Sequence, residues 1–129
     1  MDYSEKIRKY AETLGFDACG IAAVECIDPA GRFKKWLEQG FHAQMNWLIK
    51  TAEIRLDIRR RLPGAQSVVV VARNYYAARP PASPNAVRVS RYAWGKDYHD
   101  VLRYPLENLA AYIRSLAPET RTFVSIESG

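Results

Sequence analysis

The residues able to do chemistry are concentrated in one tract, Ser90 to His99, with the sequence SRYAWGKDYH. It combines three aromatic rings, an imidazole, two cations and a carboxylate with a glycine, which lets a ligand approach the backbone closely. This mixture suits a flat aromatic ligand or a nucleobase that stacks on rings and is fixed by a few hydrogen bonds. The candidate pocket residues are Arg91, Tyr92, Trp94, Lys96, Tyr98 and His99.

The same tract also has a purely structural interpretation. Trp94 and Tyr98 would then belong to the core, and Asp97 would cap the helix that follows. Capping is the better prediction for Asp97 taken alone, and His99, in the first turn of a helix, fits a structural role. Residue types alone do not decide between the ligand-binding and the structural interpretation.

Metal-ligating residues are scarce, because the chain holds two cysteines and two histidines. Cys19 and Cys26 are spaced C-x6-C, which matches no familiar zinc or iron-sulfur pattern. We therefore predict no metal site within this chain and a small, buried packing role for both cysteines. Dinucleotide, P-loop, zinc-protease and nucleophile-elbow motifs are not found in the sequence either.

Length and composition favour a single folded domain over residues 1–129, since 129 residues with 48% hydrophobic content can bury an ordinary core. This composition excludes a disordered chain and a disulfide scaffold. No apolar run of about 18 residues occurs, and the first ten residues are too charged for a signal peptide. We expect a cytoplasmic protein without a membrane partner.

The formal net charge of +5 is unevenly distributed. Residues 50–103 hold eleven basic and four acidic side chains, a balance of +7, whereas the flanking segments are each at −1. Such clustering suits a polyanion, and the excess of arginine over lysine favours phosphate or carboxylate. A solvated basic face without a dedicated partner explains the charge equally well.

Apolar spacing and capping residues predict four or five helical segments. The first follows Asp2 or Ser4 and stops at Gly15, and the second is opened by Pro29 and ended by Gly40. Residues 41–64 read as short helical pieces. The last helix carries a stripe from Leu102 to Leu116, and Pro105 predicts an interruption or kink within it.

Three strands are expected, at Phe16–Val24, Ser67–Ala72 and Arg121–Ile126. The β-branched run of the second strand predicts a place in the middle of a sheet. Residues 77–87 contain three prolines and predict an exposed, extended loop. The predicted fold class is therefore α/β, an α+β sandwich in which four or five helices cover a small mixed sheet.

Four motifs, in this order along the chain, resemble the N-terminal, cobalamin-binding region of epoxyqueuosine reductases. They are HAQMNWL (His42 to Leu48), RLDIRRRLPGAQSVVVVARNYY (Arg55 to Tyr76), SRYAWGKDYHDVL (Ser90 to Leu102) and IESG (Ile126 to Gly129). The tract RYAWGKDYH is the most specific of them. The chain accordingly looks like a fragment of a longer cobalamin and iron-sulfur protein.

The resemblance implies an oxidoreductase that reduces epoxyqueuosine in tRNA to queuosine. Its implied cofactors are cobalamin and two 4Fe-4S clusters, with the clusters in a later domain that these residues do not include. The implied partners are tRNA carrying epoxyqueuosine and an external electron donor. By this resemblance the fragment alone should be inactive.

Three site residues follow from the resemblance. Arg55 occupies the place of a family arginine that contacts cobalamin. Ser90 falls where some members place a cobalamin-contacting cysteine, so its contact is expected through the backbone. Glu127 stands where the family's V-D-T-G-type motif has an aspartate, the implied proton donor, and is one methylene longer.

Two alternative functions remain at this stage. The basic segment alone would suit a nucleic-acid-binding module without chemistry. The glutamate at position 127 would also suit a paralogous corrinoid and iron-sulfur reductase that acts on another substrate. For Arg55, a surface salt bridge with Asp57 or Glu53 is the structural alternative.

Overall fold

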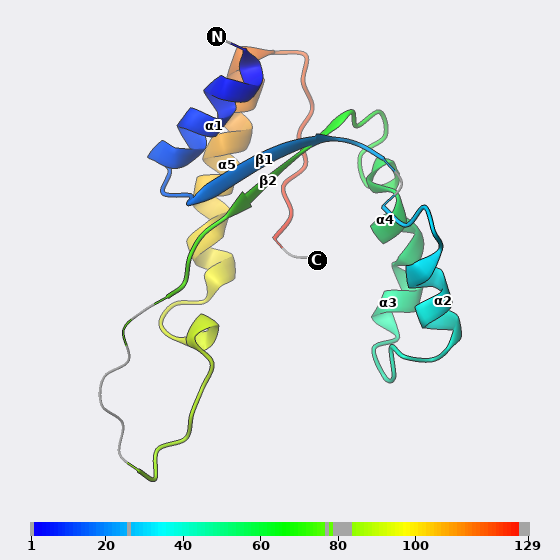
Figure 1. Cartoon of the computed structure of the whole chain (residues 1–129). Helices are drawn as coiled ribbons and strands as arrows, with labels where there is room; N and C mark the ends of the chain where they lie inside the picture. Colours follow the sequence, from blue (N-terminus) through cyan, green and yellow to red (C-terminus); the bar gives the residue numbers. More distant parts are fainter. Residues whose placement is uncertain (1, 26, 77, 79–83, 127–129) are drawn as a thin grey trace. The chain divides into compact units, whose positions relative to one another are not determined.

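The computed structural model describes residues 2–25, 27–76, 78 and 84–126, with Tyr92 described by its backbone alone. The order of elements is α1 Tyr3–Thr13, β1 Ala18–Ala23, α2 Arg32–Glu38, α3 Trp47–Lys50, α4 Ala52–Leu56, η1 Ile58–Arg60, β2 Ser67–Ala72, η2 Arg91–Ala93 and α5 Tyr98–Leu116 (Figure 1). The elements η1 and η2 are single 3₁₀ turns. Helices and a small sheet together confirm the predicted α/β class.

The described chain divides into two compact units. Residues up to Gly20 and from Val70 onward form unit 1, and Ile21–Val69 form unit 2. Unit 1 contains α1, η2 and α5, and unit 2 contains α2, α3, α4 and η1. The single domain over 1–129 stays a prediction, because this division concerns compactness alone.

The core of unit 1 forms where α1 packs against α5 (Figure 1). Ile7 and Ala11 of α1 and Leu109 and Ala110 of α5 are buried, which places an apolar stripe of each helix at the contact. Small residues on both helices permit close approach, and the rings of Tyr10 and Tyr112 stack at 4.0 Å between centroids. The stripe predicted for the last helix is thereby confirmed.

The ends of α1 match the expectation from its capping residues. The Asp2 carboxylate accepts a hydrogen bond from the Ser4 N–H at 3.2 Å, and Gly15 follows the C-cap with φ of 90°. A left-handed φ is available to glycine at little cost and strained for alanine. The helix therefore ends at Thr13, two residues before Gly15, and the chain then turns into β1.

Replacing Gly15 by alanine is expected to lower the free energy of unfolding by about 1–2 kcal/mol, because an L residue pays for the left-handed backbone. A Cβ at this position would meet nothing within 4 Å, so the cost arises in the backbone alone. Gly20→Ala is the matched control, since Gly20 also has open space but no positive φ. Equal stability of the two variants in chemical denaturation would contradict this account.

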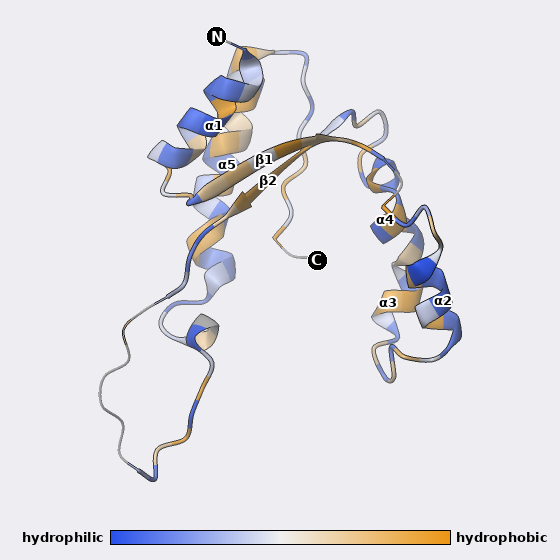
Figure 2. Ribbon diagram, viewed as in Figure 1, coloured by the Kyte–Doolittle hydropathy of each residue, from blue (hydrophilic) through white to orange (hydrophobic). Residues whose placement is uncertain are grey.

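Strands β1 and β2 form the sheet of the described residues, and their residues colour as hydrophobic in Figure 2. The pairing is antiparallel: the Asp17 N–H donates to the Ala72 carbonyl at 2.9 Å, and the Val24 N–H donates to the Gln66 carbonyl at 3.0 Å. The predicted span of β2 is confirmed residue for residue. Its expected position in the middle of a sheet is wrong for the described residues, where it pairs with β1 alone.

The expected third strand at Arg121–Ile126 is also wrong, since no regular element forms there. Its side chains nevertheless alternate between exposed and half-buried from Arg121 to Ile126, as in an extended chain. Thr122 Oγ1 accepts a hydrogen bond from Arg114 of α5. Alternation predicts extended backbone correctly but does not supply a pairing strand. Within the described residues, the sheet therefore has two antiparallel strands and is not mixed.

Helix α2 begins later than expected from Pro29. Its first helical residue is Arg32, and the N-cap position is Gly31 with φ of 66°. The Asp28 carboxylate caps the helix instead, accepting from the N–H groups of Phe33 at 3.0 Å and Lys34 at 3.3 Å. An aspartate ahead of the turn therefore outweighs the preference of proline for a first helical position.

Helix α5 runs unbroken through Pro105, so the expected interruption is wrong. Proline removes one backbone hydrogen bond and costs about 3 kcal/mol inside a helix. Burial of Leu109 and Ala110 with the half-buried residues of the same stripe offsets that cost, at about 1.5–3 kcal/mol for each fully buried large side chain. Tertiary packing thus decides the continuity of this helix.

The middle segment confirms the expectation of short helical pieces. Helices α3 and α4 and the turn η1 follow one another before Pro63 and Gly64. Of the predicted loop at 77–87, positions 77 and 79–83 lie outside the described residues, and residues 84–87 are exposed. No helix in the described part of the chain is long and apolar enough to span a membrane.

Candidate functional site

Residues Ser90 to Gly95 form a tight turn in unit 1. Ser90 precedes η2, and its carbonyl accepts from the Ala93 N–H at 3.0 Å. The Arg91 carbonyl accepts from the Trp94 N–H at the same distance, and Gly95 then reverses the chain with φ of 75°. Ser90 makes no side-chain cap, so its hydroxyl is not used to hold the turn.

Arg91 is exposed and lies against two aromatic rings. Its guanidinium carbon is 4.8 Å from the centroid of the Tyr76 ring and 5.9 Å from that of Trp94. The Trp94 indole N–H donates to the Val89 carbonyl at 2.9 Å, which fixes the ring across the turn. Cation–π contact of this kind orients a guanidinium while its N–H edges stay able to donate to a ligand.

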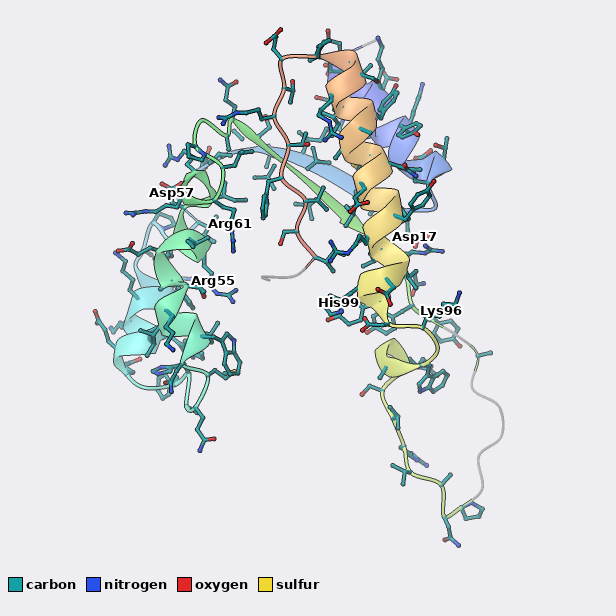
Figure 3. All side chains as sticks on the ribbon, turned by 180° about the vertical axis from the view of Figure 1, so that it is seen from behind. Asp17, Arg55, Asp57, Arg61, Lys96 and His99 are labelled. Carbon is teal, nitrogen blue, oxygen red and sulfur yellow. The ribbon has the colours of Figure 1, made fainter. Side chains whose placement is uncertain are left out.

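Asp97 caps α5, which confirms the structural prediction for this residue. Its Oδ1 accepts from the His99 N–H at 2.9 Å and lies 2.8 Å from His99 Nδ1. The Tyr98 and His99 rings stack at 4.2 Å between centroids. Figure 3 shows Lys96 and His99 at the beginning of α5, where a cation and an imidazole accompany the capping carboxylate.

The same contacts lower the pKa of the Asp97 carboxyl. The backbone hydrogen bond from His99 is the largest cause, followed by the side-chain hydrogen bond from His99. A carboxyl with a lowered folded-state pKa adds stability above its ordinary pKa of 3.8, and that stability is lost as pH falls through the lower folded value. The beginning of α5 is therefore acid-sensitive.

An NMR titration of the Asp97 side-chain carboxyl should give a midpoint below 3.8. His99→Ala removes the side-chain partner but keeps the backbone donor, so its midpoint should lie between the wild-type value and 3.8. A wild-type midpoint at or above 3.8 would show that the cap does not form in solution.

Arg55 lies on α4 of unit 2, and Figure 3 shows it with Asp57 and Arg61 along this segment. Its Nε donates to Thr51 Oγ1 at 2.8 Å, and the Thr51 hydroxyl donates to the Trp47 carbonyl at 2.6 Å. This short relay fixes the direction in which the Arg55 side chain leaves the helix.

The acids near Arg55 are engaged by other arginines. Asp57 accepts from Arg59 through both carboxylate oxygens, at 2.8 and 3.0 Å, and this bond is the main cause of its lowered pKa. Glu53 pairs with Arg60 at 3.2 Å. Both pairs are solvent-accessible, so their contribution to stability is small.

The predicted site residues divide between the two units. Ser90, Arg91, Trp94, Lys96, Tyr98 and His99 lie together on one turn and helix start of unit 1. Arg55 belongs to unit 2, which is described by itself. Glu127 and the side chain of Tyr92 lie outside the described residues.

Sequence reasoning missed two residues: Tyr76, which contacts Arg91 of this turn, and Asp17, which is bonded to Asn74 two residues before Tyr76. The Asp17 carboxylate accepts from the Asn74 N–H, 57 positions along the chain, and Tyr76 lies under Arg91. No local spacing signals either contact. Two tyrosines, Tyr75 and Tyr76, directly follow the apolar strand in the sequence, and this pattern could have indicated that a ring from this point contacts a neighbouring segment.

The described part of the chain contains no cluster of three or more His, Cys, Asp or Glu side chains that could hold a metal ion. Cys19 is half-buried and burial raises its pKa, with Arg8 opposing, so it is a weak nucleophile and ligand. Cys26 lies outside the described residues. His42 packs edge-on against Trp36, with 6.3 Å between ring centroids, and its Nδ1 is buried without a hydrogen-bond partner.

In this small α/β fold, the exposed Arg91 lies against two aromatic rings, next to a glycine turn and a capped helix. Such an arrangement would suit an aromatic or anionic ligand. Comparison with known proteins identifies the family to which this fold belongs. Residues 55–125 match the family described as Epoxyqueuosine reductase QueG, DUF1730. The chain belongs to this family.

The relatives and solved structures agree with that assignment. Epoxyqueuosine reductase of Leadbetterella byssophila is 38% identical over 98% of this chain, and that of Gloeobacter violaceus is 38% identical over 96%. These matches cover 42% and 39% of the two relatives, so the chain spans about 40% of their length.

Among solved structures, epoxyqueuosine reductase from Bacillus subtilis is 28% identical with a TM-score of 0.69, covering 91% of this chain and 32% of that one. The enzyme from Streptococcus thermophilus, at 23% identity, has the same fold with a TM-score of 0.68 over 92% of this chain and 33% of that one.

Proposed function

We propose that this chain forms part of an epoxyqueuosine reductase, an oxidoreductase that reduces the epoxide of epoxyqueuosine in tRNA and so yields queuosine. The observation that carries the proposal is the 38% identity, over 98% of the chain, to a relative of that name. Since the chain spans about 40% of such relatives, the activity is proposed for the full-length enzyme that contains these residues.

The reaction sets clear chemical requirements. Converting an epoxide to an alkene breaks two C–O bonds and releases the oxygen as water, which consumes two electrons and two protons. The site therefore needs a source of low-potential electrons and an acid beside the oxygen. An external donor in the cytoplasm would supply the electrons.

Cobalamin is the proposed cofactor at this site, where its cobalt would deliver electrons to the substrate. Arg55 and Ser90 are the residues proposed to contact it. The donor set fits such a group: the Ser90 hydroxyl is not used in capping, Arg91 is held against two rings, and Lys96 is exposed. Guanidinium and ammonium groups would bind the phosphate of cobalamin. Backbone and hydroxyl groups would form hydrogen bonds with its side-chain amides.

Two 4Fe-4S clusters are proposed to lie in the rest of the full-length enzyme, because the described residues hold no cluster of metal ligands. Such clusters require four cysteine ligands each, and this chain contains two cysteines in all. Electron relay is accordingly assigned to residues outside this chain.

Glu127 is the proposed proton donor. The Bacillus subtilis enzyme has an aspartate-bearing catalytic loop that is swung out of the active site in its structure. A glutamic acid can remain protonated near neutral pH beside an apolar body, which raises its pKa.

The tRNA substrate is supported by the basic segment, which balances at +7 over residues 50–103. Arg59, Arg60 and Arg61 are exposed at the end of this segment's helical part. Exposed arginines attract RNA phosphates through counterion release, so binding should weaken steeply with salt.

The test is conversion of epoxyqueuosine-tRNA to queuosine-tRNA by the full-length enzyme, given cobalamin and a reductant. Deleting the gene should abolish queuosine in tRNA. Retained queuosine in the deletion strain would favour a paralogous reductase with another substrate. Salt-sensitive RNA binding without any change in cobalamin absorbance would favour a binding module without chemistry.

A further inference from the structure

The end of β2 is fixed by the side chain of Asp17, the residue directly before β1. The Asp17 N–H donates to the Ala72 carbonyl at 2.9 Å, and its carboxylate Oδ2 accepts from the Asn74 N–H at 2.6 Å. The side-chain bond extends the pairing of the two strands past the last residue of β2. A bond from a backbone N–H to an ionised carboxylate is short and stronger than one between neutral groups.

Asn74 connects this bond from Asp17 to the backbone of Tyr76. Its Oδ1 accepts from the Tyr76 N–H at 2.9 Å, which is the geometry of a side-chain turn that mimics a backbone turn. Tyr76 is 67% exposed, so burial in a core does not hold its ring in place. The backbone bonds through Asn74 and Asp17 are what direct it.

The Tyr76 ring reaches the RYAWG turn. It lies 4.8 Å from the Arg91 guanidinium, which also faces Trp94 at 5.9 Å, and the Trp94 indole N–H is bonded to the Val89 carbonyl. Cation–π contacts between exposed groups are weak. Their effect is therefore local orientation rather than global stability.

We propose that Asp17 is a positioning residue: through Asn74 and Tyr76 it holds Arg91 and the Ser90–Trp94 turn in the geometry that the cofactor meets. This inference rests on the proposed function, because it assigns the turn to cofactor contact. Residues 17, 76 and 91 act as one unit although they come from three separate parts of the chain.

Preorganisation explains why such a remote carboxylate matters. A turn that is already ordered loses less conformational freedom when a ligand binds. At metal sites, mutating the residues that orient the ligating side chains changes affinity or activity by about 10- to 100-fold, which gives the scale for such effects. Removal of the Asp17 carboxylate should therefore weaken cofactor binding about tenfold, with a smaller effect on turnover at saturating cofactor.

The experiment compares full-length enzymes carrying Asp17→Ala, Asp17→Asn, Tyr76→Ala and Tyr76→Phe. Hydrogen exchange of the cofactor-free proteins reports the amides of Ala93 and Trp94, whose bonds close the turn. Cobalamin affinity is measured from its absorbance change on mixing. Asp28→Ala is the matched control, since Asp28 also accepts from backbone N–H groups but belongs to unit 2.

Asp17→Ala and Tyr76→Ala should each accelerate exchange at Ala93 and Trp94 several-fold and weaken cobalamin binding about tenfold. The double variant should be no worse than either single one, because both break the same connection. Asp17→Asn, which keeps an acceptor oxygen, and Tyr76→Phe, which keeps the ring, should restore most of both properties. Asp28→Ala should leave both unchanged.

Unchanged exchange at Ala93 and Trp94 in Asp17→Ala would overturn the inference, even where Asn74 itself exchanges faster. Additive effects in the double variant would also overturn it. If the wild-type enzyme binds no cobalamin, the proposed cofactor assignment fails, while the exchange measurements still decide whether Asp17 positions the turn.

Discussion

Replacing Glu127 by glutamine in the full-length enzyme is expected to reduce the turnover of epoxyqueuosine-tRNA by about 10²–10⁴-fold. The epoxide oxygen must gain protons before it can leave as water, and glutamine is nearly the same size as glutamic acid but donates no acidic proton. Cobalamin binding and tRNA affinity should change little, because the substitution targets the chemical step. Single-turnover kinetics with saturating cobalamin separates the rate of the chemical step from the binding of cobalamin and tRNA.

Two companion variants sharpen this test. Glu127→Asp restores the aspartate expected from the family resemblance and should retain most activity. Glu119→Gln removes the carboxylate of an exposed glutamate and should be neutral. Wild-type turnover by Glu127→Gln would exclude the proton-donor role and direct attention to His99 or Lys96.

Truncating Leu109 to alanine should give the largest loss of stability in unit 1, about 2–5 kcal/mol. This side chain is 3% exposed and lies on α5, which packs against α1, where Ala11 is fully buried. The other buried residues of the two helices are Ile7, Ala11 and Ala110, so Leu109 is one of only two large side chains buried on these helices. Its truncation leaves a cavity that small neighbours fill poorly.

Hydrogen exchange of the α1 and α5 amides in the full-length enzyme measures this loss as a lower free energy of opening. Tyr104→Ala is the matched control on the same helix, because Tyr104 is 71% exposed and its removal should stay within about 0.5 kcal/mol. Equal protection in Leu109→Ala and Tyr104→Ala would show that the contact between α1 and α5 is not the core of this unit.

Local signals predicted much of the fold. Asp2 and Gly15 bound α1, Ser67–Ala72 forms β2, and Asp97 caps α5, because each depends on residues within a few positions of one another. Failures occurred where distant partners decide the outcome. Pro105 is tolerated because α5 packs on α1, and residues 121–126 are extended without becoming a strand.

The candidate site was likewise predictable only where its residues are close together in the sequence. The tract Ser90 to His99 and the cap at Asp97 were identifiable from local sequence, because they depend on residues within a few positions of one another. Asp17 was not, since its bond to Asn74 spans 57 positions and depends on the antiparallel pairing of β1 with β2. Pairing of distant strands has no local spacing rule, and side-chain roles that depend on it appear only in three dimensions.

The exposed apolar surface of the sheet and its surroundings has a practical consequence for solubility. Val70 of β2 is 60% exposed and Phe123 is 50% exposed, and a two-stranded sheet is marginally stable by itself. Exposed strand edges and apolar side chains promote self-association. A preparation limited to these residues should aggregate as its concentration rises, so stability and binding measurements require the full-length enzyme.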